Sequence, residues 1–340
     1  MDSLTQIVLG AACGEAILGK KIGNKALLFG AIGGTIPDLD VFVGSLLYGN
    51  EIDAMLFHRG FMHSILFSVL AAFLLGWLVH KLYDSGKRLQ TTTQKDWTKL
   101  FFWSLFTHPI LDCFTPYGTQ LFAPFSNYRV AFNNIAVADP LYTVPFLVCL
   151  IILMFFKRKS QRRRLWLKMG IGISSFYMLL TIFNKIYVDN IFENSLSDKG
   201  ISYSRYSTQP AILNNVLWYG IAETEEFYQV GFYSLFDSSK RFSDWQTIPK
   251  TRALTKAEYN DIEGLAWFSN DYFNVESIDD DNYLYKDLRY PLVETRQGYK
   301  AVFNLKLFKE GDRLNMKPFA PEMEDFDYTF NALWRRLKGR

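Results

Sequence analysis

The chain has 340 residues, a formal net charge of +3 at pH 7 and an aromatic share of 17%. This length allows two or more domains, and so small a charge argues against a nucleic-acid-binding protein. The apolar share of 49% is concentrated before about residue 186 and is high for a soluble enzyme, so it predicts a membrane protein.

Six apolar segments follow one another in this first half. A bilayer core requires about 20 apolar residues. The third, fifth and sixth segments come close to that length, whereas the others are short or interrupted by Gly, Pro and Asp, as in helices packed inside a bundle. We predict an α-helical integral membrane bundle of about six spans over residues 1–186; the alternative is a soluble all-helical protein. The segments are Leu4–Gly19, Ala26–Leu47, Ile65–Tyr83, Leu100–Cys113, Leu141–Phe156 and Leu165–Phe183.

Basic residues crowd three of the connections between these segments, at 20–25, 81–99 and 157–168. Short loops rich in Lys and Arg stay in the cytoplasm. The opposite ends of the spans, and everything after about Asn184, are therefore expected outside. This arrangement predicts a multi-pass protein of the cell (inner) membrane, in contact with membrane lipids.

Residues 187–340 read as an extracytoplasmic soluble domain, either α+β or mainly β. Val216–Ala222 and Phe227–Phe236 are rich in aromatic and β-branched residues, and four polar residues separate them. This pattern predicts a β-hairpin. Tyr299–Phe308 alternates well enough to predict another strand.

Three polar clusters lie at the ends of apolar segments. They are Pro37–Asp40, His58–Ser64 and His108–Asp112, and the last one places imidazole and carboxylate four residues apart on one helical face. The remaining histidine, His80, falls at the cytoplasmic end of the third segment.

Neutral imidazole and ionised carboxylate are ligands that zinc and similar ions accept. Carboxylates at the edge of a bilayer core are costly, and a metal ion would offset that cost. Each cluster also has a purely structural explanation, as helix caps and turns, as interfacial histidines or as a hydrogen-bonded pair. Under the predicted topology all three clusters share one membrane face, which favours a divalent-metal site on the extracytoplasmic side. The candidate ligands are Asp38, Asp40, His58, His63, His108 and Asp112.

Over about residues 1–145 the chain resembles the membrane-bound metal-dependent hydrolases, which are also described as LexA-binding, inner-membrane-associated hydrolases. That family is in turn distantly similar to zinc-dependent phospholipases C and single-strand nucleases. The stretches that carry the resemblance are Met1–Gln6, Pro37–Asp40, His58–Ser64, His108–Asp112, Thr115–Gly118 and Asp139–Pro140.

The resemblance implies a zinc site with ligands from Asp38, His58 or His63, His108 and Asp112. Many family members have His where Gln6 stands, which makes Gln6 a further candidate ligand. The phospholipases' later His-x-x-x-Glu pair has no counterpart, so one or two ions are expected rather than three.

The function that this resemblance implies is hydrolysis of a phosphoester, in a lipid or another amphiphilic substrate, by a metal-activated water. Asp38 or Asp112 would act as general base, Arg59 or a second ion would neutralise charge on a phosphoryl oxygen, and Asp139 would orient a ligating histidine. Two alternatives are a metal-binding membrane transport or sensor protein, and a membrane scaffold that the metal staples together.

Overall fold

The computed structural model describes residues 1–319 and 325–340 and divides them into two compact units. The first unit comprises Met1–Gly44 and Phe57–Ile182, and the second comprises Ser45–Leu56 and Phe183–Arg340. The expected boundary at 186/187 lies close to the observed one, which falls between Ile182 and Phe183 inside a long helix. It also assigns Ser45–Leu56, expected in the helical part, to the second unit.

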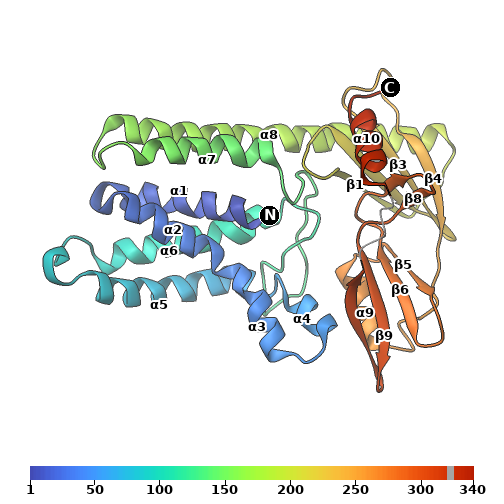
Figure 1. The fold of residues 1–340 in the computed structure, drawn as a ribbon, viewed down its shortest axis with the longest axis horizontal. Helices are drawn as coiled ribbons and strands as arrows, with labels where there is room; N and C mark the ends of the chain where they lie inside the picture. The colour runs from blue at the N-terminus through green and yellow to red at the C-terminus, as the bar shows by residue number, and fades with distance from the viewer. Residues whose placement is uncertain (320–324) are drawn as a thin grey trace. The chain divides into compact units, whose positions relative to one another are not determined.

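The first part of the chain is helical (Figure 1). Helix α1 packs against α2 and α6, α6 packs against α5, and α7 packs against α1. The elements are α1 (Ser3–Ile22), α2 (Asn24–Thr35), η1 (Pro37–Leu39), α3 (Asp40–Leu47), α4 (Glu51–Phe57), η2 (Phe61–His63), α5 (Ile65–Tyr83), η3 (Gly86–Arg88), α6 (Gln94–Asp112), α7 (Pro140–Met154) and α8 (Gln161–Asp198).

Besides most of α4 and the C-terminal part of α8, the second unit contains strands and two further short helices. Its sheets are antiparallel, with strand orders β1-β2-β3-β4 and β10-β9-β6-β5, and β7 pairs with β8. The elements are β1 (Arg205–Pro210), β2 (Leu217–Glu223), β3 (Phe227–Ser234), β4 (Ser243–Pro249), α9 (Asn260–Phe268), β5 (Phe273–Ser277), β6 (Asn282–Asp287), β7 (Val293–Thr295), β8 (Gly298–Lys300), β9 (Asn304–Glu310), β10 (Arg313–Phe319) and α10 (Phe326–Leu337).

The expected hairpin is confirmed, since β2 and β3 pair from Leu217 opposite Ser234 to Glu223 opposite Tyr228. The single strand expected over Tyr299–Phe308 is instead divided between β8 and β9. The chain therefore forms a helical region followed by a region of β-sheets.

The expectation of about six membrane spans is wrong. All six apolar segments are helical, but among the described residues only α5 and α8 are long and apolar enough to cross a membrane. The pair Asn24–Thr35 and Pro37–Leu47, bent by 43°, adds a third if it forms one span. The other segments fail for physical reasons: α7 has only 15 residues, and α1 and α6 carry the charged residues Glu15, Lys20, Lys95 and Asp96.

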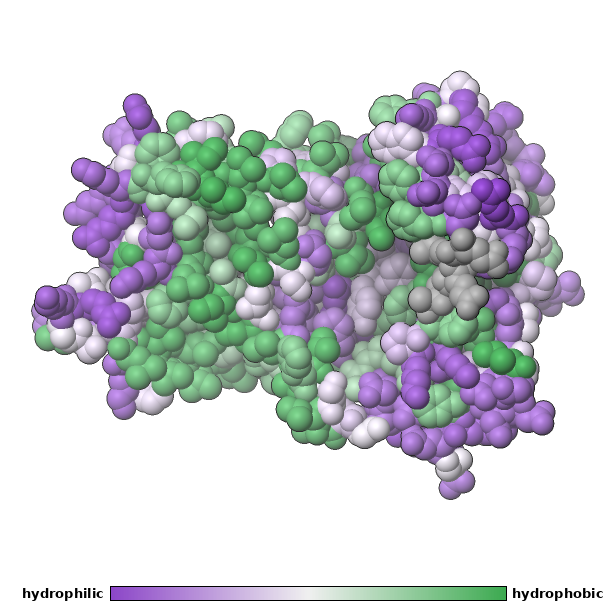
Figure 2. All heavy atoms as spheres, in the orientation of Figure 1, coloured by the Kyte–Doolittle hydropathy of each residue, from purple (hydrophilic) through white to green (hydrophobic). Residues whose placement is uncertain are grey.

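The outer surface of the helical unit is nonetheless largely hydrophobic, as Figure 2 shows for one face. Exposed side chains include Leu70, Phe73 and Leu74 of α5 and Phe176 and Leu179 of α8. An exposed apolar surface of this kind marks a protein or membrane interface.

Glycines allow α1 and α2 to approach within backbone contact. Gly10 and Gly14 in α1 face Gly30 and Gly34 in α2, each pair spaced by four residues. A Cβ atom added at Gly30 would lie 2.8 Å from Gly14 Cα, and one added at Gly10 would lie 2.9 Å from Gly34 Cα. Small residues at this spacing permit close helix packing in membrane proteins.

Caps fix where the helices begin. Ser64 accepts a hydrogen bond from Phe67 N and starts α5, Asp2 accepts one from Thr5 N and starts α1, and Thr93 and Asp96 form a capping box that starts α6. The cap at Ser64 leaves His63 just outside α5, in the turn η2.

The segment Ser45–Leu56 is anchored in the second unit. Ile52 is fully buried in a cluster that includes Ile262 and Leu314, and Asn50 Nδ2 donates a hydrogen bond to Leu314 O at 2.7 Å. The guanidinium group of Arg313 contacts Asp53 at 2.8 Å. The chain thus leaves the first unit after Gly44 and returns at Phe57.

We expect Ile52→Ala to destabilise the protein by about 2–4 kcal/mol, because truncation of a fully buried side chain leaves a cavity. Leu46→Ala is the matched control in the same segment, since Leu46 is 87% exposed. Thermal unfolding of the detergent-solubilised protein measures both. Equal melting temperatures for the two variants would show that the segment is not anchored as described.

Candidate metal centre

Four buried or half-buried side chains converge near the ends of helices in the first unit. His108 and Asp112 lie in the last turns of α6, Asp38 lies in η1 and His63 lies in η2. The side chains of His63, His108 and Asp112 are fully buried, whereas the side chain of Asp38 is 25% exposed. Asp38 is therefore the donor that solvent reaches most easily.

The donor atoms of these four residues lie close enough to hold one metal ion. His108 Nε2 lies 3.1 Å from His63 Nε2, 3.4 Å from Asp38 Oδ1 and 3.5 Å from Asp112 Oδ2. His63 Nε2 lies 3.4 Å from Asp38 Oδ1 and 3.6 Å from Asp112 Oδ2. All four donor atoms lie within 4.8 Å of one another, so this buried cluster could bind a metal ion.

The second nitrogen of each imidazole faces an acceptor. His108 Nδ1 donates to Gly34 O at 2.6 Å, and His63 Nδ1 lies 3.0 Å from Asp40 Oδ2. The hydrogen bond of His108 holds a proton on its Nδ1. The Asp40 carboxylate, which contacts His63 Nδ1 without a hydrogen bond, favours a proton there through its charge, so both rings keep the lone pair on Nε2. In the neutral rings, two lone pairs therefore face each other across 3.1 Å. A cation or a proton between them removes the repulsion.

Electrostatics at the end of α6 favour charged side chains. Burial favours the neutral acid, but Arg59 and the amino group of Met1 outweigh it and hold the pKa of Asp112 well below its usual range. Burial likewise opposes the imidazolium ion, but Asp112 and Asp38 outweigh it and raise the pKa of His108 to about 9. Without a metal ion, His108 therefore carries a proton at neutral pH.

Asp40 and His58 lie just outside the four donors. His58 Nδ1 lies 2.7 Å from Asp40 Oδ1, while Asp40 Oδ2 accepts a hydrogen bond from the backbone N–H of Arg59 at 2.9 Å. Asp40 thus fixes the turn between the two histidines and the orientation of His63. Sequence analysis leaves open whether His58 or His63 is a ligand, and the structure brings His63 into the donor set.

Gln6 also lies beside the donors. Its side-chain amide donates hydrogen bonds to Asp112 Oδ1 at 2.9 Å and to His108 O at 3.2 Å. The amino group of Met1 contacts the same Asp112 oxygen. Gln6 therefore orients Asp112 through its nitrogen. Its buried Oε1 has no hydrogen-bond partner among the described residues, so the expected role of Gln6 as a ligand stays a prediction.

Arg59 is buried beside the site. Its Nε lies 3.3 Å from Asp112 Oδ2, its Nη1 donates to Thr115 Oγ1 at 3.1 Å, and its guanidinium carbon lies 4.5 Å from the ring centroid of Tyr117. Its backbone has a φ of 61°. These contacts hold the guanidinium group of Arg59 beside the four donor residues.

Asp139, expected to orient a histidine, has a different position. It caps α7 by accepting a hydrogen bond from Leu141 N at 3.0 Å, and it accepts another from the Tyr177 hydroxyl at 2.8 Å. Within residues 1–319 and 325–340 it forms no hydrogen bond with a histidine.

Sequence analysis does not single out Gly34, whose carbonyl group fixes the His108 tautomer. The repeated four-residue spacing of glycines in α1 and α2 is the signal that could have identified it, because it predicts a close helix contact next to the polar clusters.

We expect Asp40→Asn to weaken metal binding about 10-fold to 100-fold, because the amide cannot hold the His63 ring as the carboxylate does. Asp53→Asn removes a carboxylate outside the donor set and serves as the control. Competition with a fluorescent chelator measures the affinities. Equal affinities in the two variants would mean that Asp40 does not support His63.

A helical unit with an apolar exterior and a buried His and Asp cluster at its helix ends defines a membrane protein with a potential metal site. The model of the family described as YdjM inner membrane protein matches residues 1–188, and the chain belongs to this family. It is also 29% identical over 162 residues to a protein of Bacillus subtilis (strain 168) described as uncharacterized protein YfhP. That match covers 45% of this chain and 46% of the relative, so it spans about half of each. No solved structure matches the chain.

Proposed function

We propose that the protein is a membrane-bound, metal-dependent hydrolase that cleaves a phosphoester in an amphiphilic substrate. The observation that supports this best is the buried cluster of two imidazole nitrogens and two carboxylate oxygens, whose donor atoms all lie within 4.8 Å of one another. A metal ion there would supply a water of lowered pKa as nucleophile.

Zinc is the proposed ion. Five of the six donor separations are given above and average 3.4 Å, and the sixth, between Asp38 and Asp112, is within 4.8 Å. Tetrahedron edges of about 3.4 Å place the centre about 2.1 Å from each corner, close to zinc–nitrogen and zinc–oxygen bond lengths. Borderline imidazole and hard carboxylate donors together suit zinc and similar divalent ions. One ion accounts for the donor set; in the hydrolase, Asp38, the most exposed donor, would leave its position to the nucleophilic water.

Two residues of the chain have proposed roles in catalysis. Asp38 is the most accessible donor, and its carboxylate could accept a proton from an incoming nucleophile. Arg59 lies against Asp112 and carries a positive charge that would favour a phosphoryl oxygen at the site.

The proposed location of the site is the extracytoplasmic face of the inner membrane. Lys21 Nζ lies 2.5 Å from Asp96, and Arg158 donates to Lys21 O at 2.6 Å, so three basic connections meet at one end of the helical unit. Asp96 and Asp112 are separated by most of the 19-residue helix α6, about 28 Å long. Positive charge favours the cytoplasm, which leaves the donor cluster on the other side. A site there, in a protein with an apolar exterior, fits a lipid or a lipid-linked phosphate.

The test uses the full-length protein purified in detergent. Elemental analysis is expected to give about one zinc per chain. A screen of phosphomonoesters and phosphodiesters, including phospholipids, follows with chelated and zinc-restored protein. Turnover that disappears on chelation and in Asp38→Asn supports the proposal, whereas bound zinc without turnover of any phosphoester refutes it.

The second candidate is a membrane scaffold stapled by the metal. It is favoured because four protein donors can close a tetrahedral site, as in structural zinc sites, whereas catalytic zinc usually keeps one position open. Chelation distinguishes the two proposals: a scaffold loses much of its thermal stability without metal, while an enzyme keeps its fold and loses turnover.

Metal affinity is expected to rise with pH between 6 and 8, by up to tenfold per unit. The reason is competition, since a proton occupies His108, whose pKa is raised to about 9, and the metal must displace it. Chelator competition at pH 6, 7 and 8 measures the trend. An affinity independent of pH would contradict the protonation state given above.

A further inference from the structure

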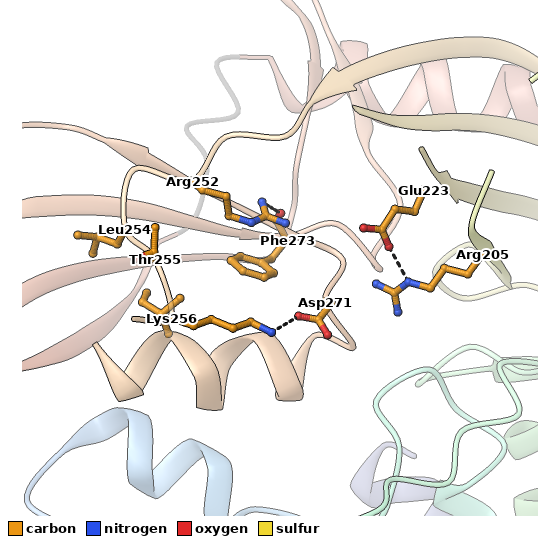
Figure 3. A pocket seen from close by; sticks show the side chains of 9 residues that line it. Arg205, Glu223, Arg252, Leu254, Thr255, Lys256, Asp271 and Phe273 are labelled. Carbon is orange, nitrogen blue, oxygen red and sulfur yellow. Dashed lines mark hydrogen bonds and ion pairs between the residues drawn. The ribbon is translucent and has the colours of Figure 1, made fainter. Parts of the chain in front are cut away.

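The second unit contains an open pocket of about 700 Å³ that the metal site does not involve (Figure 3). Strands β1 and β2 contribute Arg205 and Glu223 on one side, and Arg252, Lys256 and Phe273 lie across from them. The volume exceeds the space that a simple inorganic anion needs and falls within the range of pockets for small organic ligands.

The charges in this pocket leave one cation without a counterion. Glu223 contacts both Arg205, at 2.5 Å, and Lys250, at 2.7 Å. Asp271 contacts Lys256 at 2.7 Å. Arg252, by contrast, contacts no carboxylate among the residues that the structure describes. The pocket therefore has an excess of positive charge and favours an anion.

Both arginines are held rigidly by other groups. Arg252 Nη2 donates to the Tyr228 hydroxyl at 2.9 Å and Nη1 donates to Asn274 Oδ1 at 3.1 Å, and its guanidinium carbon lies 3.8 Å from the Phe273 ring centroid. The guanidinium carbon of Arg205 lies 4.2 Å from the ring centroid of Tyr272. Stacking on aromatic rings fixes a guanidinium plane and so lowers the entropy lost when a ligand binds.

In each of the two arginines, one guanidinium nitrogen makes no hydrogen bond to the described residues and can donate to a ligand. Arg205 uses Nε for Glu223 and Nη1 for Asn270 O at 2.8 Å, and its Nη2 has no partner within residues 1–319 and 325–340. Arg252 Nε likewise has no partner in that part of the chain. Spare guanidinium N–H groups of this kind bind carboxylate and phosphate oxygens.

We infer that this pocket binds a small organic anion whose carboxylate or phosphate group contacts Arg205 and Arg252. Leu254, Ile262 and Phe273 line the same pocket and provide an apolar surface for the body of the ligand. This site is independent of the proposed hydrolase activity, because none of its residues belongs to the metal cluster.

Isothermal titration of the chelator-treated, full-length protein tests the inference. The probes are phenyl phosphate, benzoate, inorganic phosphate and uncharged phenol. We expect phenyl phosphate, benzoate or both to bind, inorganic phosphate to bind at least tenfold more weakly, and phenol not to bind. Comparison of phenyl phosphate with benzoate identifies the preferred head group.

Two variants test whether the anion binds in this pocket. Arg252→Gln removes the unpaired charge, and Lys256→Glu adds repulsion at an exposed position where it cannot disturb the core. Both are expected to weaken anion binding about 10-fold to 100-fold. Lys309→Glu is the control, because Lys309 also pairs with a loop aspartate, Asp281, but does not line the pocket.

Binding by wild type and Lys309→Glu with loss in Lys256→Glu supports the inference even if Arg252→Gln fails to fold. Failure of both organic anions to bind at millimolar concentration overturns it. Equal binding of phenol, inorganic phosphate as the best ligand, or wild-type affinity in Lys256→Glu also overturns it.

Discussion

His108→Ala is expected to abolish stoichiometric metal binding. In the proposed site four protein donors would share the ion. Structural zinc sites bind with about 10–16 kcal/mol in total, so each donor would contribute about 2.5–4 kcal/mol on average. Loss of one donor therefore weakens binding by about 100-fold or more. The same substitution leaves Gly34 O without its hydrogen bond and opens a cavity in a fully buried position.

His80→Ala is the matched control, because His80 lies in the last turn of α5, outside the donor cluster. Since His108→Ala could lose metal by unfolding, Asp38→Asn provides a second variant at the most exposed donor. Inductively coupled plasma mass spectrometry gives the metal content, and circular dichroism reports the fold. If His108→Ala and His80→Ala retained equal metal, His108 would not be a ligand.

The substitution Gly30→Leu is expected to prevent α1 and α2 from packing and to remove the metal site with them. A Cβ atom at Gly30 would overlap the backbone carbonyl of Gly10 and approach Gly14 Cα, so no side-chain rotation relieves the clash. Ordinary overpacking costs about 1–3 kcal/mol, and a clash with rigid backbone costs more. Separation of the helices also moves Gly34 away from His108 and Gln6 away from Asp112.

Gly172→Leu in α8 is the control for the loss of a helical glycine, because a Cβ atom there meets no atom within 4 Å. Leucine is the better helix former, so this variant should be at least as stable as the wild type. The melting temperature and the metal content of both variants test whether α1 and α2 are in close contact at Gly30. A Gly30→Leu protein with unchanged metal content would contradict the close helix contact.

Most of the donor cluster could be predicted from the sequence. His108 and Asp112 are four residues apart on a helix, and this spacing alone places their side chains on one face, with the donor atoms 3.5 Å apart in the structure. The choice between His58 and His63 could not be predicted. It depends on a turn in which Arg59 has a positive φ and on the two oxygens of Asp40, each of which faces one of these histidines.

The number of spans could not be predicted because apolar content alone does not distinguish a lipid-facing helix from a helix buried among others. Helix α1 contains ten buried residues, including the polar Thr5, Gln6 and Glu15, whereas α5, of nearly the same length, contains only four. The buried ion pair between Glu15 and Arg163, at 2.6 Å, joins positions 148 residues apart, and neither sequence neighbourhood indicates the other.

The anchored segment Ser45–Leu56 has a consequence for the order in which the chain acquires its structure during synthesis. Asn50 and its partner Leu314 are 264 positions apart, so the ribosome must add all the residues between them before this contact can form. Asp38 and Asp40 precede the segment, and His58 and His63 follow it. The segment that joins these two pairs of residues therefore acquires this contact only after the strand that carries Leu314 has been made. A chain interrupted before β10 would lack Leu314 and Met316, two of the side chains that bury Ile52, and the segment would remain without its complete anchor.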